Sequence, residues 1–197
     1  MTTRAPTWGA GGLAVWFAVA ACTEPAPAPE TPPPTPTTAP ALPPDTVDVR
    51  GVTRAVAEVE PVGDGNVRGT VRLLQTDAGV RVRAELAGLS ESGFHALQIL
   101  RGRDCDADPA VHLGVDAGTP HGGPYSLPGE RHAGDLGNIR GDDGEGRYDR
   151  IDPVLTLVGT GSAVGRAVVV RAGRDDAASP DGAAGAIIGC GVLQPND

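Results

Sequence analysis

The stretch VRGTVRLLQTDAGVRVRAELAGL, residues 67–89, carries the clearest structural pattern in this sequence. Apolar and polar side chains alternate in residues 67–75 and again in residues 80–89, with Thr76-Asp77-Ala78-Gly79 between the two runs. A period of two places the apolar side chains on one face of a strand, and residues such as Asp and Gly are typical of turns. The stretch therefore predicts two antiparallel strands that bury one face.

Short segments of the same kind continue on both sides of this stretch. They are residues 54–62, 93–100, 136–152 (with a turn at 142–146), 154–159, 163–173 and 186–193. No amphipathic helix of useful length separates them. Seven or eight short strands over about 150 residues predict an all-β fold, either a sandwich or a Greek-key barrel.

The N-terminus has the features of an export signal. Residues 1–21 contain one positive charge, Arg4, followed by the apolar run GLAVWFAVAA, which is too short to span a bilayer. The run ends in Val19-Ala20-Ala21-Cys22, which resembles a bacterial lipoprotein box and predicts cleavage before Cys22 and lipid attachment to it. The alternative is an ordinary secreted protein that is cleaved near Ala21.

The proline-rich residues 22–45 then predict an extended tether, and residues 46–197 a folded domain. Together these features place the domain in a bacterial cell envelope, outside the cytoplasm, on the periplasmic or the outer-membrane face. The lipid anchor at Cys22 makes a membrane the expected partner.

The net charge and the cysteine content indicate which partners are unfavourable and whether a disulfide can form. The net charge of −9 argues against nucleic acid as a partner. If Cys22 carries lipid, the remaining two of the three cysteines are Cys105 and Cys190. Export exposes them to an oxidising compartment, where such a pair is expected to form a disulfide.

Three of the four histidines fall in one polar, Gly/Pro-rich loop. They are His112, His121 and His132, and Asp135 follows the last by three residues. Long loops inside compact domains are usually either functional or disordered. Three imidazoles and one carboxylate make a complete tetrahedral ligand set for zinc, so the loop predicts a zinc site. The alternative is that histidines collect in a surface loop by chance.

Several strings, taken together, resemble the copper/zinc superoxide dismutase family over residues 54–193. They are Gly93-Phe94-His95, His121-Gly122-Gly123-Pro124, RHAGDLGN at 131–138, GRAVVV at 165–170, Asp175-Asp176 and GCGV at 189–192. The resemblance implies an eight-stranded Greek-key β-barrel with long zinc and electrostatic loops. It places the family's zinc ligands on His112 (the bridging position), His121, His132 and Asp135. It also implies that Asp175 is the carboxylate that links the copper and zinc sites, and that Cys105 and Cys190 form the family disulfide.

The copper positions depart from the family pattern. The family's His-x-His pair falls on His95 and Leu97, so only the first member is a histidine. The last copper histidine falls on Arg171, and the active-site arginine on Ile187. Of the copper ligands, His95 and the bridging His112 remain.

These departures predict a domain that keeps zinc and binds copper weakly or not at all. Zinc has no redox chemistry, so a zinc-only domain cannot dismutate superoxide, and four protein ligands leave no open position for zinc hydrolysis. Arg171 either replaces the copper charge structurally or points to solvent. Gln98 is expected to face away from Leu97 and to be a poor substitute ligand.

The preferred interpretation is thus a non-catalytic, zinc-binding member of the family. The alternative is an active dismutase with a divergent copper site, and the sequence leaves the enzymatic status open. A homodimer is compatible with the sequence, which identifies no protein partner.

Overall fold

The two alternating runs form adjacent strands. In the computed structural model, which describes residues 51–105, 111–114 and 118–197, β2 (Arg68–Thr76) pairs antiparallel with β3 (Gly79–Ala87). Their register runs from Arg68 opposite Ala87 to Thr76 opposite Gly79. The signal peptide, Cys22 and the tether predicted in residues 1–45 lie outside the described residues.

Most of the other strands follow the predicted segments closely. They are β1 (Arg54–Pro61), β4 (Ser92–Ile99), β5 (Asp135–Asp142), β6 (Glu145–Asp152), β7 (Ala167–Arg171) and β8 (Ile187–Val192). The two-residue β9 (Gln194–Pro195) lies outside every predicted segment. No helix in the described part of the chain is long and apolar enough to cross a membrane.

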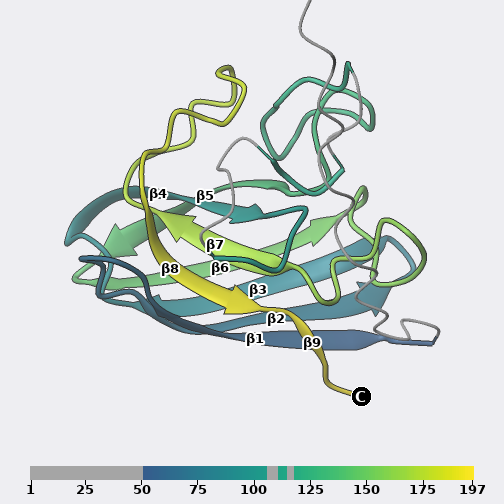
Figure 1. Cartoon of the computed structure of the whole chain (residues 1–197), viewed down its shortest axis with the longest axis horizontal. Coiled ribbons are helices and arrows are strands. Elements are labelled where there is room, and N and C mark those ends of the chain that lie inside the picture. Colours follow the sequence, from purple (N-terminus) through teal and green to yellow (C-terminus); the bar gives the residue numbers. More distant parts are fainter. Residues whose placement is uncertain (1–50, 106–110, 115–117) are drawn as a thin grey trace, which may run out of the picture. The chain divides into compact units, whose positions relative to one another are not determined.

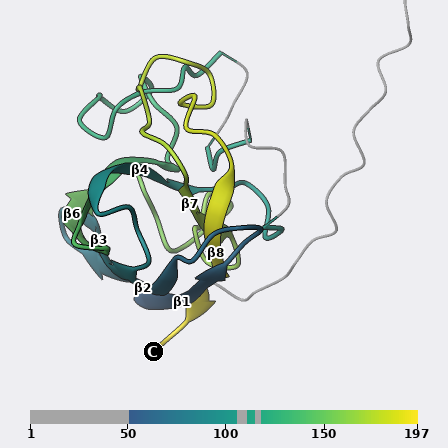
Figure 2. The same cartoon turned by 90° about the vertical axis from the view of Figure 1, so that its left-hand side faces the viewer.

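The strands form a closed antiparallel barrel (Figures 1 and 2). Their order is β2-β3-β6-β5-β4-β7-β8-β1, and the pairing of β1 with β2 closes the ring. β9 adds to the same edge of β1 that β8 occupies. Because β3 neighbours β6 and β4 neighbours β7, the connections are those of a Greek key. The predicted eight-stranded barrel is therefore confirmed.

The barrel interior is filled by small aliphatic side chains that alternate along each strand. On β3, Val80, Val82 and Leu86 are buried, whereas Arg81 and Arg83 lie on the outer face. A second, smaller cluster lies outside the barrel against β4, β7 and β8, and consists of Leu100, Ala167, Val169 and Cys190. The side of β4 and β7 that faces away from the interior is therefore also covered.

The predicted strand at 154–159 is wrong. Leu155 and Leu157 are buried in the core, but the segment makes only one isolated bridge, between Thr156 and Ser162. The Asp152 carboxylate accepts hydrogen bonds from the backbone N–H groups of residues 154 and 155 at 2.9 and 3.1 Å, which turns the chain. A short apolar run cannot by itself distinguish a strand from a loop that covers the core.

Two long connections rise from the same side of the barrel in both views (Figures 1 and 2). One joins β4 to β5 and contains the described residues 111–114 and 118–134, which we call the first loop. The other, residues 172–186, joins β7 to β8 and is called the second loop. The candidate site lies where these loops meet β4, β5 and β7.

Candidate metal centre

The four residues predicted to bind zinc meet at one point. His112, His121, His132 and Asp135 are all buried, and one ligand atom from each lies within 4.8 Å of the others. His112 is held by an isolated antiparallel bridge to Leu100, and Asp135 is the first residue of β5. The polar loop noted in the sequence is thus folded around one cluster.

The Asp135 carboxylate lies at the centre of this cluster. Its Oδ1 atom is 2.8 Å from Nδ1 of His112, 3.1 Å from Nδ1 of His121 and 3.2 Å from Nδ1 of His132. Its Oδ2 atom accepts the backbone N–H groups of Gly122 at 3.1 Å and His132 at 2.8 Å. The backbone therefore fixes one carboxylate oxygen and directs the other at three imidazole nitrogens.

Contacts on the far side of two rings determine where their protons lie. The His121 Nε2 atom is 2.8 Å from Oδ1 of Asp175, and the His132 Nε2 atom is 3.0 Å from the Thr119 carbonyl oxygen. A carbonyl or carboxylate oxygen only accepts, so each Nε2 carries the proton. In a neutral ring, Nδ1 then directs a lone pair at Asp135 Oδ1. Lone pairs directed at a carboxylate oxygen repel it unless a cation or a proton lies between them.

This arrangement fits a divalent metal ion. The His121 Nδ1 atom is buried and has no hydrogen-bond partner among the described residues, as expected for an atom that ligates a metal. Three imidazole nitrogens and a carboxylate oxygen are a preferred zinc set, and the Nε2 contacts orient the rings as outer partners of zinc ligands do. His112, His121, His132 and Asp135 would hold the ion.

The imidazoles and carboxylates of the cluster shift one another's pKa values. Burial lowers the pKa of His121, but the carboxylates of Asp135 and Asp175 on either side of the ring outweigh it and raise the pKa to about 9. Burial raises the pKa of Asp135, but His112 and His121 lower it well below its ordinary value. Negative charge therefore persists at Asp135, which favours a cation between the rings.

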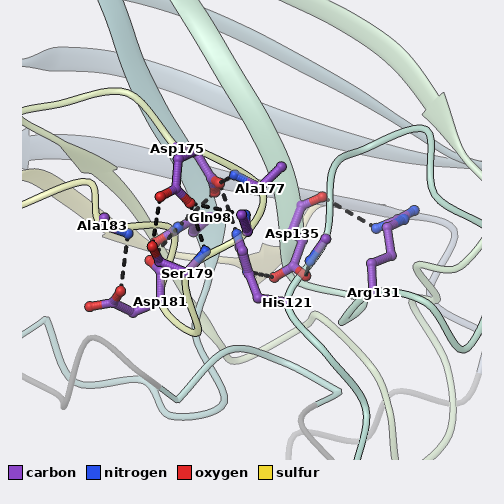
Figure 3. Close-up of polar contacts among 12 residues, drawn as sticks. Gln98, His121, Arg131, Asp135, Asp175, Ala177, Ser179, Asp181 and Ala183 are labelled. Atoms are coloured by element: carbon purple, nitrogen blue, oxygen red, sulfur yellow. Dashed lines mark hydrogen bonds and ion pairs between the residues drawn. The ribbon is translucent and has the colours of Figure 1, made fainter.

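Asp175 connects the cluster to the second loop and to β4 (Figure 3). Its Oδ1 atom accepts from His121 Nε2 and from the Ala177 backbone N–H, each at 2.8 Å. Its Oδ2 atom accepts from Gln98 Nε2 at 3.1 Å. The carboxylate thus orients a cluster histidine and is itself held from two directions, as the resemblance implied for its imidazole contact.

The backbone of Asp175 is fixed to β5, and its carboxylate packs closely against Gly182. The Asn138 side chain donates to the Asp175 carbonyl at 3.0 Å and accepts from its N–H at 2.8 Å. Gly182 has a φ of +77°, and a Cβ there would lie 2.7 Å from the Asp175 carboxyl carbon. A side chain at position 182 would therefore displace the carboxylate.

A buried ion pair between Arg131 and Asp152 holds the backbone of the cluster. Arg131, which is 2% exposed, donates through Nη2 to both Asp152 oxygens at 2.6 and 2.7 Å. Its Nη1 donates to the backbone carbonyls of His132 at 3.0 Å and Asp135 at 3.3 Å. The pair holds the backbone of two cluster residues; sequence reasoning assigned no role to either member.

His95 lies apart from the cluster, contrary to its expected copper position. Its Nδ1 donates to the Arg171 carbonyl at 3.0 Å, and its Nε2 accepts from the Ser90 N–H at 3.2 Å and contacts the Ser90 hydroxyl at 2.7 Å. Both ring nitrogens are therefore used by the protein. His95 joins the β3–β4 connection to β7 and is not a ligand here.

The expected position of Leu97 is also corrected. Leu97 and Ile99 point into the barrel core, so Gln98 and Leu100 are the residues that face the loops. Gln98 does face away from Leu97, as expected, but that direction is toward Asp175. The signal was in the sequence, because strand parity puts residues 98 and 100 on one face once residues 97 and 99 are assigned to the core.

Arg171 is buried rather than solvent-facing. It is 2% exposed, and its Nε donates to Gln98 Oε1 at 2.6 Å while its Nη1 donates to the Gly185 carbonyl at 2.9 Å. Burial lowers the pKa of Arg171, and the carboxylates of Asp181 and Asp175 oppose that effect. Ile187 packs against the small apolar cluster that includes Leu100.

The disulfide predicted from the cysteine count is present. Cys105 and Cys190 are joined by an S–S bond of 2.03 Å with their Cα atoms 5.9 Å apart. The bond links Cys105, in the connection between β4 and β5, to β8.

Comparison with known proteins gives a consistent result. The family model for copper/zinc superoxide dismutase (SODC) matches residues 67–193. The chain is 35% identical over 153 residues to "Superoxide dismutase [Cu-Zn]" of Paramecium bursaria Chlorella virus 1, covering 72% of this chain and 80% of that protein. It is 37% identical over 159 residues to "Superoxide dismutase [Cu-Zn] 3" of Arabidopsis thaliana, covering 73% and 92%. The crystal structure of the clock protein EA4 is similar with a TM-score of 0.63 and 28% identity, covering 73% of this chain and 95% of that one.

Proposed function

Because the chain belongs to the copper/zinc superoxide dismutase family, we propose that it is a zinc-binding member whose copper centre has been replaced by protein side chains. The domain then has a structural zinc site and does not dismutate superoxide. One observation carries this proposal: Arg171, Gln98 and Asp175 form a continuous buried chain of hydrogen bonds on the face beside the zinc cluster.

Zinc suits the cluster in this proposal and has a structural role. His112, His121, His132 and Asp135 supply four ligands, which leaves no open position for water, so zinc-assisted hydrolysis is disfavoured. Zinc contributes a fixed positive charge that relieves the repulsion around Asp135 Oδ1. It contributes no redox chemistry.

In this proposal the lost copper positions lie on the outer face of β4, which carries Gln98. Gln98 and Leu100 have the two-residue spacing of a His-x-His pair and face the loops, so we place the lost pair there instead of at His95 and Leu97. Leucine offers no ligand, and a guanidinium such as that of Arg171 stays protonated and cannot ligate. Its positive charge, held next to Gln98, also opposes a copper ion.

Arg171 replaces the missing cation in charge and in contacts. It lies one side chain away from Asp175, through Gln98, and it also bonds the Gly185 carbonyl of the second loop. Buried charges are stable only when they are paired and hydrogen-bonded. Arg171 thus connects the barrel to the second loop without a second metal.

A second candidate function is an active superoxide dismutase, which converts superoxide to oxygen and hydrogen peroxide. One observation favours it: His112 Nε2 is buried and has no hydrogen-bond partner among the described residues. That atom belongs to the bridging position, so it is available to a second metal. Gln98 Oε1 is a weak ligand that is already bonded to Arg171, which makes tight copper binding at this place unfavourable.

The location of the domain is part of the proposal. The lipoprotein box that ends at Cys22 and the proline-rich residues 22–45 support a lipid-anchored, extracytoplasmic protein of a bacterial cell envelope. A homodimer is compatible with this arrangement.

The test is a superoxide dismutase assay after loading with zinc and copper, on the natural chain and on the triple variant Gln98→His/Leu100→His/Arg171→His. We expect the natural chain to be inactive and the variant to gain copper binding. Activity in the copper-loaded natural chain would refute the proposal. Adding His95→Ala to the triple variant should leave its copper binding unchanged, because the His95 ring bonds the Arg171 carbonyl and Ser90 and lies away from the site.

A further inference from the structure

The outer face of the sheet formed by β1, β2, β3 and β6 has an uneven charge distribution. The strand registers place its side chains in rows across the sheet. At one end, the first row consists of Arg54, Leu74, Arg81 and Ile151. The second row consists of Val56, Arg72, Arg83 and Asp149. Four arginines and one carboxylate therefore share this end, which we call the cationic patch.

The opposite end of the same face is acidic. Its outward-facing charged residues are Glu58, Glu60, Glu85, Glu145, Arg68 and Arg147. The whole chain carries a net charge of −9, so the cationic patch stands out against its surroundings. This separation gives the domain a preferred orientation in the field of an anionic surface.

The protein satisfies the patch only in part. Asp149 accepts from Arg81 Nε and Nη2 at 2.7 Å each and from Arg83 Nε at 3.1 Å. Arg72 donates to the Thr70 hydroxyl at 2.6 Å, and its closest carboxylate, Glu85, is 3.8 Å away. At the rim, the Asp197 carboxylate accepts from the Thr53 hydroxyl and from the Thr53 and Arg54 backbone N–H groups.

The register sets two arginines against each other, and Asp149, the carboxylate of their row, bonds only one of them, Arg83. Arg72 stands directly opposite Arg83 in the β2–β3 ladder. Like charges at directly opposed positions destabilise a sheet. A ligand with negative charge over the two strands offsets that repulsion. Such a ligand competes with Asp149 for Arg81 and Arg83, but not for Arg54 and Arg72.

The surface shape and apolar content of the patch suit a lipid headgroup. All four arginines line a hollow of about 190 Å³ together with Ala55, Leu73, Leu74 and Asn196. Arginine binds phosphate oxygens with two parallel N–H groups. Leu74 and Ile151 are 38% and 45% exposed in the same row, which is the combination of cationic and aliphatic side chains found at membrane interfaces.

The chain also reaches the barrel at this place. Arg54 is the first residue of β1, so the described chain enters the barrel at the edge of the patch. β1 and β2 lie on the side of the barrel away from the two loops in both views (Figures 1 and 2). A domain resting on this face would leave its metal cluster directed away from the surface.

We propose that the cationic patch docks on the phosphate groups of anionic lipids in the membrane that anchors the chain. The proposal adds an orientation to the proposed membrane anchor and is independent of the proposed metal chemistry. Each arginine near an anionic membrane surface contributes roughly a fivefold gain in binding. Removing two of them is therefore expected to weaken docking on the order of twentyfold.

The experiment measures arginine reactivity in the full chain reconstituted into nanodiscs. Phenylglyoxal labelling rates are read by mass spectrometry, in phosphatidylcholine alone and in phosphatidylcholine containing phosphatidylglycerol. We expect Arg54, Arg81 and Arg83 to react several times more slowly with the anionic lipid, and Arg147 to react equally in both. High salt should abolish the difference, because exposed charges are screened.

Matched variants make the test specific. Arg72→Ser/Arg83→Ser should remove the protection of Arg54 and Arg81, whereas Arg68→Ser/Arg147→Ser at the acidic end should leave it unchanged. Equal labelling of the natural chain in both lipids would overturn the proposal. Equal protection in phosphatidylcholine by added inorganic phosphate would also overturn it and assign the hollow to a soluble anion. Co-elution of the chain with neutral nanodiscs checks the anchor separately.

Discussion

Arg171 provides the most informative perturbation for the proposal that side chains replace the copper centre. Its Nε donates to the Gln98 amide oxygen at 2.6 Å, and Gln98 is fully buried, so Arg171→Met leaves that oxygen without a donor and without water. An unsatisfied buried acceptor costs about 1–3 kcal/mol, and the upper end applies here because the buried carboxylate of Asp175 also loses a nearby positive charge. The Gly185 carbonyl is exposed and adds little, because water replaces the lost donor.

We therefore expect Arg171→Met to lower the free energy of unfolding by about 3 kcal/mol. The assay is urea unfolding followed by circular dichroism, with a chelator present so that zinc does not contribute. With a urea dependence of about 2 kcal/mol per molar, the unfolding midpoint should fall by about 1.5 M. Arg174→Met is the matched control, since Arg174 is exposed and lies 4.6 Å above the Phe94 ring, a contact expected to contribute about 0.5–1 kcal/mol.

A double-mutant cycle tests the reason for the effect. Removing both partners in Gln98→Leu/Arg171→Met leaves no unpaired polar group between them, so the double variant should cost less than the sum of the two single variants. The coupling should exceed about 1 kcal/mol. If Arg171→Met is no more destabilising than Arg174→Met, or if the single effects simply add, then Arg171 does not replace a structural cation.

Three further predictions concern Asp175, Asp152 and Tyr148. Asp175→Asn should weaken zinc binding about 10–100-fold in a chelator competition, because it removes the carboxylate that orients His121, whereas the exposed Asp176→Asn should leave affinity unchanged. Asp152→Asn should lower the free energy of unfolding by about 3–5 kcal/mol, measured in urea, because it leaves the buried Arg131 charge uncompensated. Burial raises the pKa of Tyr148 to about 12, so the stability that its protonated hydroxyl contributes is present below its ordinary pKa and is lost as pH rises toward 12. In the Tyr125→Phe variant, whose remaining tyrosine is Tyr148, phenolate absorbance of the folded protein should titrate near 12. A titration midpoint at the ordinary tyrosine value would contradict this prediction.

Period-two alternation was sufficient to predict most of the barrel. In β3, for example, Val80, Val82 and Leu86 enter the core while Arg81 and Arg83 stay outside, as the sequence indicates. The same argument fails for residues 154–159, because an apolar segment can fill the end of a barrel without joining its hydrogen-bond ladder. What excludes a strand there is the Asp152 carboxylate bonding to the following backbone, which no local pattern shows.

The cluster of three histidines and Asp135 was predictable because its members fall in one loop of unusual composition. The surroundings of His95 and Leu97 were predicted less well, since they depend on strand parity and not on residue type. His95 follows Gly93-Phe94 and resembles a family ligand, yet its ring bonds the Arg171 carbonyl and Ser90. The contacts of Gln98 and Asn138 depend on a loop more than thirty residues away in sequence, beyond the reach of local patterns.

Metal content tests the central claim most directly. The purified chain is exposed to equal amounts of zinc and copper, dialysed exhaustively, and analysed for both metals by mass spectrometry. We predict one zinc and no copper per chain, as the four buried ligands and the buried Arg171 require. One zinc together with one firmly held copper would contradict the account and make an active dismutase the better interpretation.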